Sequence, residues 1–99
     1  MIIEHAVLSV TPGREVEFEA AMTEALPLIE SAPGCLGATV RREVENPTHY
    51  LLLVQWATVS DHVEGFRQSP AFERWRSLTH HFYDERPVVT HFESPLPRE

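Results

Sequence analysis

Two adjacent histidines and an arginine near the end of the chain are the residues best suited to acid–base chemistry. His80 and His81 follow each other in the segment WRSLTHHF, and Arg76 lies four residues before His80. An imidazole titrates near neutral pH and can accept a proton from a phenol. A guanidinium one helical turn away can stabilise the oxyanion that results. His80 is therefore a candidate catalytic base and Arg76 a candidate oxyanion-binding group. The alternative is that both are polar residues on the flank of a helix.

Helical geometry separates the two histidines, because successive residues on a helix point about 100° apart. The inward stripe predicted for this segment consists of Phe72, Trp75, Thr79 and Phe82. His80 lies at the edge of that stripe, whereas His81 lies further round the helix. We therefore expect His80 to reach a pocket and His81 to lie in solvent.

Aromatic residues in the same half of the chain could line an apolar cavity for a flat ligand. A cavity for a polycyclic or quinone-like molecule needs large apolar side chains with a few polar groups among them. The alternative is that these aromatics form the core of a small domain. The candidate pocket residues are Trp56, Phe66, Phe72 and Trp75.

The remaining histidines offer weaker signals. His5 shares a face of the first strand with Ile3 and Val7, and we expect a buried, hydrogen-bonded structural residue there. The alternatives are that it enters the pocket or the dimer interface. His62 falls in a short helix and is expected to be exposed. No histidine pair has a metal-ligand spacing such as HExxH, and Cys35 is the only cysteine. The sequence therefore predicts no metal site.

Composition limits the possible partners and compartments. The net charge of −7 disfavours nucleic acid and anionic membranes as partners. All eight basic residues are arginine, so lysine Schiff-base chemistry is excluded. No segment approaches the roughly 20 apolar residues of a membrane span, and the start of the chain lacks the features of a signal peptide. A single Cys35 fits a reducing compartment. We expect a cytoplasmic protein without a membrane partner.

The order of predicted elements indicates the fold. The first strand is rich in β-branched residues and is interrupted by Glu4 and His5. The second helical region divides at Gln68 and Ser69, because Ser69 followed by Pro70 is a helix start. The expected strands are 2–10, 35–44, 49–57 and 86–93, and the expected helices are 15–29, a short one ending near 67, and 70–83.

This β-α-β-β-α-β order predicts an α+β fold of the ferredoxin-like class, a four-stranded antiparallel sheet with helices on one face. We expect a single domain over residues 1–99, with a C-terminal tail at 94–99.

The composition of the third strand predicts that both faces of the sheet are covered. Leu51, Leu52, Leu53 and Val54 form a continuous apolar run, which is typical of a strand with two dry faces. A chain of 99 residues can cover one face of the sheet with helices but has no residues left for the other. We therefore expect a homodimer in which a partner covers the second face. The alternative is a two-layer monomer.

Four short motifs, in this order and spacing, carry a resemblance to a known family. They are Thr11-Pro12-Gly13, the run from Ala32 to Gly37, Val54-Gln55-Trp56, and the run from Ser69 to Phe72. On these motifs the chain resembles the antibiotic biosynthesis monooxygenase (ABM) family of dimeric α+β barrels. The resemblance implies two subunits whose sheets pack face to face, with a pocket between the sheet and the helices of each.

The resemblance also implies candidate activities. Some members oxidise quinols or anthrones with O₂ and without metal or flavin, because the deprotonated substrate supplies the electrons. Our leading hypothesis is therefore a cofactor-independent monooxygenase acting on a small aromatic. The alternatives are a non-catalytic ligand-binding or protective protein and an isomerase on the same barrel.

Haem degradation, found in another branch of the family, is disfavoured. That branch uses an Asn on the first strand, a Trp late in the short helix and a His in the last helix. Here the only asparagine is Asn46 in a turn, Phe66 stands near the Trp position, and Arg76 stands near the His position. Many other members carry a His near the position of Phe66.

Overall fold

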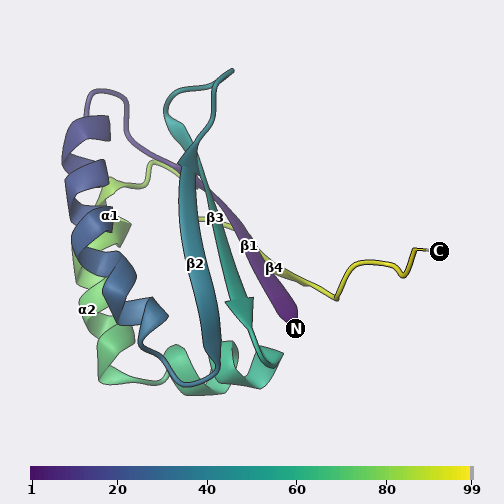
Figure 1. Cartoon of the computed structure of the whole chain (residues 1–99). Helices are drawn as coiled ribbons and strands as arrows, with labels where there is room; N and C mark the ends of the chain where they lie inside the picture. Colours follow the sequence, from purple (N-terminus) through teal and green to yellow (C-terminus); the bar gives the residue numbers. More distant parts are fainter. Residues whose placement is uncertain (99) are drawn as a thin grey trace.

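The computed structural model of the protein describes residues 1–98 as a curved sheet with helices on one side (Figure 1). In chain order the elements are β1 (Ile2–Ser9), α1 (Glu15–Glu30), β2 (Cys35–Arg42), β3 (His49–Trp56), the π-helical turn η1 (Asp61–Phe66), α2 (Pro70–Thr79), the 3₁₀ turn η2 (His80–Phe82) and β4 (Val89–Phe92).

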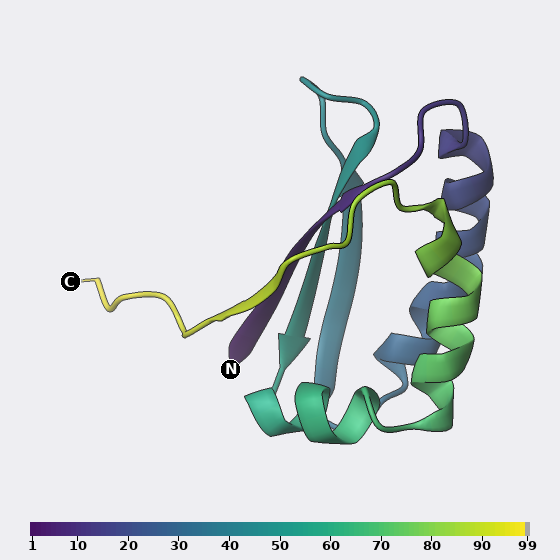
Figure 2. The same ribbon diagram turned by 180° about the vertical axis from the view of Figure 1, so that it is seen from behind.

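The four strands form one antiparallel sheet in the order β2-β3-β1-β4. The long central pair, β1 and β3, runs in register from Ile2 opposite Trp56 to Ser9 opposite His49. α1 and α2 cover the same face of this sheet, as both views show (Figures 1 and 2). The predicted ferredoxin-like fold with helices on one face is confirmed.

Alternation along β3 divides its side chains between the two faces of the sheet. The residues that face the helices are buried, and they pack on Phe18 and Ile29 of α1. Leu51 and Leu53 point to the other face and are only half-buried. The buried positions of β3 are Tyr50, Leu52, Val54 and Trp56.

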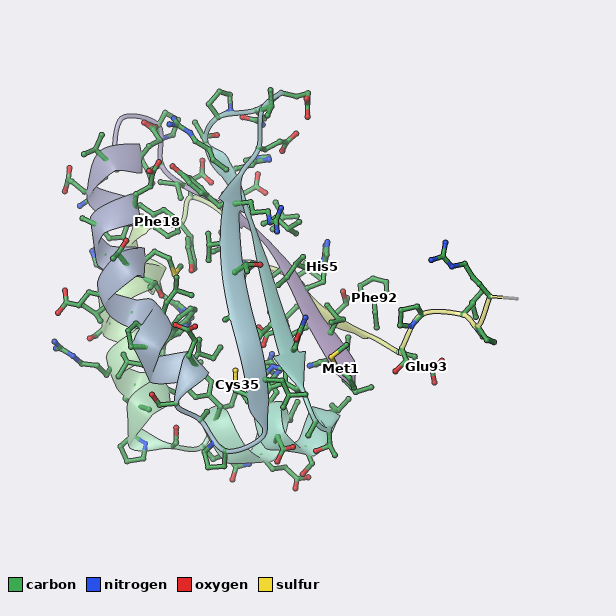
Figure 3. All side chains as sticks on the ribbon, viewed as in Figure 1. Met1, His5, Phe18, Cys35, Phe92 and Glu93 are labelled. Carbon is green, nitrogen blue, oxygen red and sulfur yellow. The ribbon has the colours of Figure 1, made fainter. Side chains whose placement is uncertain are left out.

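The face of the sheet away from the helices carries His5 and Phe92, whereas Phe18 lies on the helix side (Figure 3). His5 is half-buried and packs edge-on against Phe92, with ring centroids 5.6 Å apart. Its imidazole makes no hydrogen bond within residues 1–98. The prediction of a buried, hydrogen-bonded His5 was therefore wrong, because the helices cover the opposite face of β1.

The second helical region divides where the sequence predicts. Ser69 caps α2 by accepting a hydrogen bond from the backbone N–H of Phe72. α2 ends at Thr79, earlier than the predicted limit of 83, and continues as the 3₁₀ turn η2. Among the helices of residues 1–98, none combines the length and apolarity that crossing a membrane requires.

The last strand is shorter than predicted. β4 begins at Val89 rather than at residue 86, because Pro87 has no N–H to donate to a neighbouring strand. Residues 84–87 instead line the side of a cavity. Beyond β4 the tail leaves the sheet and extends away from the domain (Figure 2). Glu99, the last residue of the predicted tail, lies outside the described residues.

Gly34 fixes the approach of η1 to the start of β2. Its φ of +85° lies in the left-handed region, which favours glycine. A Cβ at this position would overlap the side chain of Asp61 at the start of η1. A glycine is therefore required for η1 to pack closely against this end of the sheet.

Candidate functional site

A cavity of about 800 Å³ lies between the sheet and α2. This volume is in the range of small-molecule sites. Four apolar side chains of the sheet line part of it, namely Ala6, Leu8, Leu52 and Val89. The loop of residues 84–87 lines another part of its wall. The cavity is thus built from segments distant in sequence, with polar and aromatic side chains on the remaining walls.

Three of the four predicted aromatic residues line this cavity. Phe66 and Phe72 pack edge to face with centroids 5.6 Å apart, and Phe66 meets Trp75 at 6.2 Å. Trp56 instead lies behind the wall, where it is fully buried. Its indole stacks on His62 with centroids 5.3 Å apart and an interplanar angle of 17°. Trp56 therefore supports the wall without lining the cavity.

The two predicted catalytic residues line the same cavity. Arg76 comes from α2 and His80 from its junction with η2. The half-buried His80 ring lies 6.1 Å from the ring of Phe72 and 5.3 Å from that of Tyr83, centroid to centroid. Burial and the charges of Arg76 and Arg86 lower the pKa of His80 from its usual 6.5. The imidazole is therefore neutral at pH 7, which is the form that accepts a proton. His81, by contrast, is exposed, as predicted.

The structure also reveals a buried polar chain that reaches the cavity. Glu4 and His62, each 3% exposed, both line it. Glu4 Oε1 lies 3.3 Å from His62 Nε2 and accepts a hydrogen bond of 2.9 Å from Trp56 Nε1. On the far side of the ring, His62 Nδ1 lies 2.8 Å from His91 Nε2. One carboxyl group and two imidazoles are thus linked in a row.

Electrostatics keeps His62 neutral. Burial, with the charge of Arg67 and the neighbouring His91, lowers the pKa of His62 to about 3. Burial also raises the pKa of Glu4, although the Trp56 N–H and Arg67 act in the opposite direction. We assign the ring proton of His62 to Nε2, on the side of Glu4, so that Nδ1 accepts from His91. The 3.3 Å separation of Nε2 from Glu4 Oε1 is an electrostatic contact, whereas the 2.8 Å contact of Nδ1 with His91 is a hydrogen bond.

The sequence prediction of an exposed His62 was wrong. The π-helical turn η1 directs this side chain towards the sheet, a direction that regular helical spacing does not give. Glu4 could have been found from the strand pattern, because it alternates with Ala6 and Leu8 on the face that the helices cover. A charged residue at a core position of a strand is a signal for function.

The four-stranded antiparallel sheet with helices on one face defines an α+β domain of the ferredoxin-like class. The chain belongs to the antibiotic biosynthesis monooxygenase family, whose sequence profile matches residues 1–78. This confirms the resemblance seen in the sequence motifs.

Similar proteins span nearly the whole chain. The uncharacterized protein YczJ of Bacillus subtilis is 41% identical over 93 residues, which cover 94% of this chain and 98% of YczJ. The crystal structure of a putative antibiotic biosynthesis monooxygenase from Bordetella bronchiseptica is 43% identical, with a TM-score of 0.91 and coverage of 96% and 97%. SnoaB of Streptomyces nogalater, a cofactor-independent oxygenase, shares the fold at 16% identity, with a TM-score of 0.82 and coverage of 97% and 94%.

The buried neutral His62 predicts acid destabilisation. Its pKa of about 3 lies below the 6.5 of an unfolded histidine, so between these values only the unfolded state binds the proton. The free energy of unfolding should therefore fall with decreasing pH from 6.5, by up to about 1.4 kcal/mol per unit from this residue. The raised pKa of Glu4 has the opposite effect, because the folded state binds this proton more readily than the unfolded state does. The free energy of unfolding should therefore fall less steeply at the acid end of this pH range.

Urea unfolding at pH 6.5 and 5 measures this effect. A His62→Gln variant, which cannot be protonated, should lose less stability over this interval than the unaltered protein. His81→Gln, at an exposed position, is the matched control and should behave like the unaltered protein. Equal pH dependence in all three proteins would contradict the account.

Proposed function

We propose that the protein is a cofactor-independent monooxygenase that oxidises a small aromatic of the quinol or anthrone type with O₂. The observation that carries the proposal is that Arg76 and the neutral His80 line one cavity together with Phe66, Phe72 and Trp75. Membership of the antibiotic biosynthesis monooxygenase family supports the same activity. The chain also shares its fold with SnoaB, a cofactor-independent oxygenase, and this likeness is compatible with the proposed activity.

The aromatic wall would bind the flat substrate and exclude water. His80 would take the proton of the phenolic or enolic hydroxyl, and Arg76 would stabilise the oxyanion left behind. The anion is electron-rich enough to give electrons to O₂. For an anthrone, the two hydrogens of the ring methylene leave with one oxygen atom as water, while the other oxygen atom becomes the new carbonyl. The substrate supplies all the electrons, so atoms and charges balance without a separate reductant.

We also propose that two copies of the chain pack through the uncovered face of the sheet. Leu51 and Leu53 lie at the centre of this face, beside Val7, which is 43% exposed. Phe92, 55% exposed, extends the apolar surface onto β4. Burying such a face against a second copy removes apolar area from water on both chains at once.

Loss of His80 should reduce oxidation. Oxygen uptake with a panel of quinols and anthrones, in chelator-treated buffer, should be well above that of heat-denatured protein, which controls for autoxidation. The His80→Ala variant should be slower by about 10²-fold or more, because a general base contributes on that order. His81→Ala is the matched control, since this neighbouring histidine is exposed, and it should retain full activity.

Each outcome of this assay decides between functions. If His80→Ala leaves oxygen uptake unchanged, the proposed oxygenase activity would stand, but His80 would not be its catalytic base. No uptake above the denatured control would contradict the oxygenase, and tight binding of the same compounds would then identify a ligand-binding protein.

A charge at the centre of the uncovered sheet face should separate the dimer. The unaltered protein should have twice the chain mass of 11.3 kDa by light scattering after gel filtration. Leu53→Glu should shift it to the single-chain mass, because it would place an unpaired charge in an apolar interface. Val16→Glu, on α1 and 84% exposed, is the control and should remain dimeric. An unaltered protein that runs as a single chain would contradict the dimer.

A further inference from the structure

We propose that Glu4, His62 and His91 form a proton path between the cavity and the solvent at the edge of the sheet. The inference rests on the proposed function and deepens it, since it connects a carboxyl group on the cavity wall to the edge of the sheet. The three residues come from β1, η1 and β4, so only the folded chain brings them together.

The inner end of the path is Glu4. Its Oε1 accepts from Trp56 and lies 3.3 Å from His62 Nε2, whereas Oε2 has no hydrogen-bond partner in the described part of the chain. Yet no buried side-chain nitrogen or oxygen among residues 1–98 lacks a partner. Oε2 must therefore reach accessible space, and because Glu4 lines the cavity and is otherwise buried, that space is the cavity. A carboxylate oxygen is thus presented to whatever occupies the cavity.

The outer end of the path is His91. β4 is the edge strand of the sheet, and His91 lies directly opposite Glu4 on the neighbouring strand β1. His91 is half-buried, so that its ring joins the interior to the protein surface. His62 bridges the two ends from η1, with 3.3 Å to the carboxyl oxygen and 2.8 Å to the His91 nitrogen.

Imidazole is the side chain that suits such a bridge, because its two nitrogens lie on opposite sides of the ring. When Glu4 is protonated, it donates to His62 Nε2, while His62 Nδ1–H donates to His91 Nε2. Outward transfer moves the Glu4 proton to His62 Nε2 and the Nδ1 proton to His91 Nε2. His91 then releases the proton on its own Nδ1 to solvent. One proton has left the cavity, and His62 is neutral before and after.

The same geometry argues against a metal site. His62 uses opposite ring nitrogens towards its two partners, so one cation could not bind all three side chains. In keeping with this, residues 1–98 contain no group of three or more His, Cys, Asp or Glu side chains placed to hold a metal ion.

The charges around the chain favour neutral imidazoles. Arg67, at the end of η1, lowers the pKa of both His62 and His91. Its charge also lowers the pKa of Glu4, against the larger effect of burial, which raises it. The other titratable neighbours of Glu4 are Cys35 and Tyr83, whose pKa values its carboxylate helps to raise. A proton that enters the chain is therefore not trapped on either ring.

Exchange of the His62 ring proton with water tests the path without substrate. In the unaltered protein, NMR should show this N–H exchanging faster than the Trp56 indole N–H, by at least 10-fold after each rate is divided by its rate in an unfolded peptide. Both ring nitrogens lie close to the same Glu4 oxygen, at 2.9 Å for Trp56 and 3.3 Å for His62, but only His62 lies on the path. Equal protection of the two N–H groups would overturn the proposal.

A variant at the outer end separates a conducting role from a structural one. The amide of His91→Gln can still donate to His62 Nδ1 but cannot pass a proton on. It should therefore keep the unaltered melting temperature and a neutral His62, slow the His62 ring exchange at least 10-fold, and lower turnover, with partial rescue by added imidazole. His81→Gln, at the exposed neighbouring site, should change none of these.

The outcomes distinguish this proposal from the proposed function. If the His62 ring proton exchanges more slowly in His91→Gln but the unaltered protein takes up no oxygen, the proton path is supported and the oxygenase is contradicted. Oxygen uptake with ring exchange and turnover unaffected by His91→Gln would keep the oxygenase and reject the path. If His91→Gln fails to fold, the comparison of His62 with Trp56 in the unaltered protein decides.

Discussion

The structure of this end of the molecule depends on the contacts of the Glu4 carboxyl group with Trp56 and His62. A buried carboxylate is costly unless it is hydrogen-bonded, and here its polar neighbours come from two other elements. Trp56 at the end of β3 donates to Oε1, and the ring of His62 in η1 lies 3.3 Å from the same oxygen. Removing the Trp56 donor would leave the carboxyl group without its hydrogen bond. The contact therefore fixes η1 to the central strands, and with it the adjoining wall of the cavity.

The cavity combines two titratable sites whose environments differ. His80 lies beside Arg76 on the helical side and is half-buried. Glu4 and His62 enter from β1 and η1 and are almost fully buried. In both places burial disfavours the charged form, which leaves the imidazoles as neutral proton acceptors at pH 7. Between these sites lie the apolar side chains that a flat aromatic ligand would contact. The titratable groups thus share one cavity with apolar side chains.

Local signals in the sequence were sufficient for most of the fold. Ser69 followed by Pro70 marked the start of α2, and the continuous apolar run Leu51–Val54 indicated a strand with two apolar faces, of which the helices cover only one. The spacing of Arg76 and His80 placed both on the flank of α2 that lines the cavity. Residues 86 and 87 were assigned to a strand, because nothing local showed that this segment lines the cavity instead.

The polar chain was harder to predict because it is a tertiary feature. His62 owes its burial to a π-helical turn, which no spacing rule for an ordinary helix describes. Its partners lie 58 and 29 residues away along the chain. Only Glu4 could have been identified from the sequence, since it occupies a core position in β1. The charged residue that breaks the apolar pattern of this strand is a buried carboxyl group on the cavity wall, and it does not interrupt the strand.

The central claim is that the cavity binds a hydroxyaromatic compound and removes its proton. An absorption titration with a hydroxyanthraquinone under anaerobic conditions tests it most directly, because the phenol and phenolate forms have different spectra and no oxidation follows. The account predicts that binding produces the phenolate band at a pH where the free compound is a neutral phenol, and that His80→Ala binds the compound without this band. Binding with an unchanged phenol spectrum in the unaltered protein, or no binding, would contradict the account.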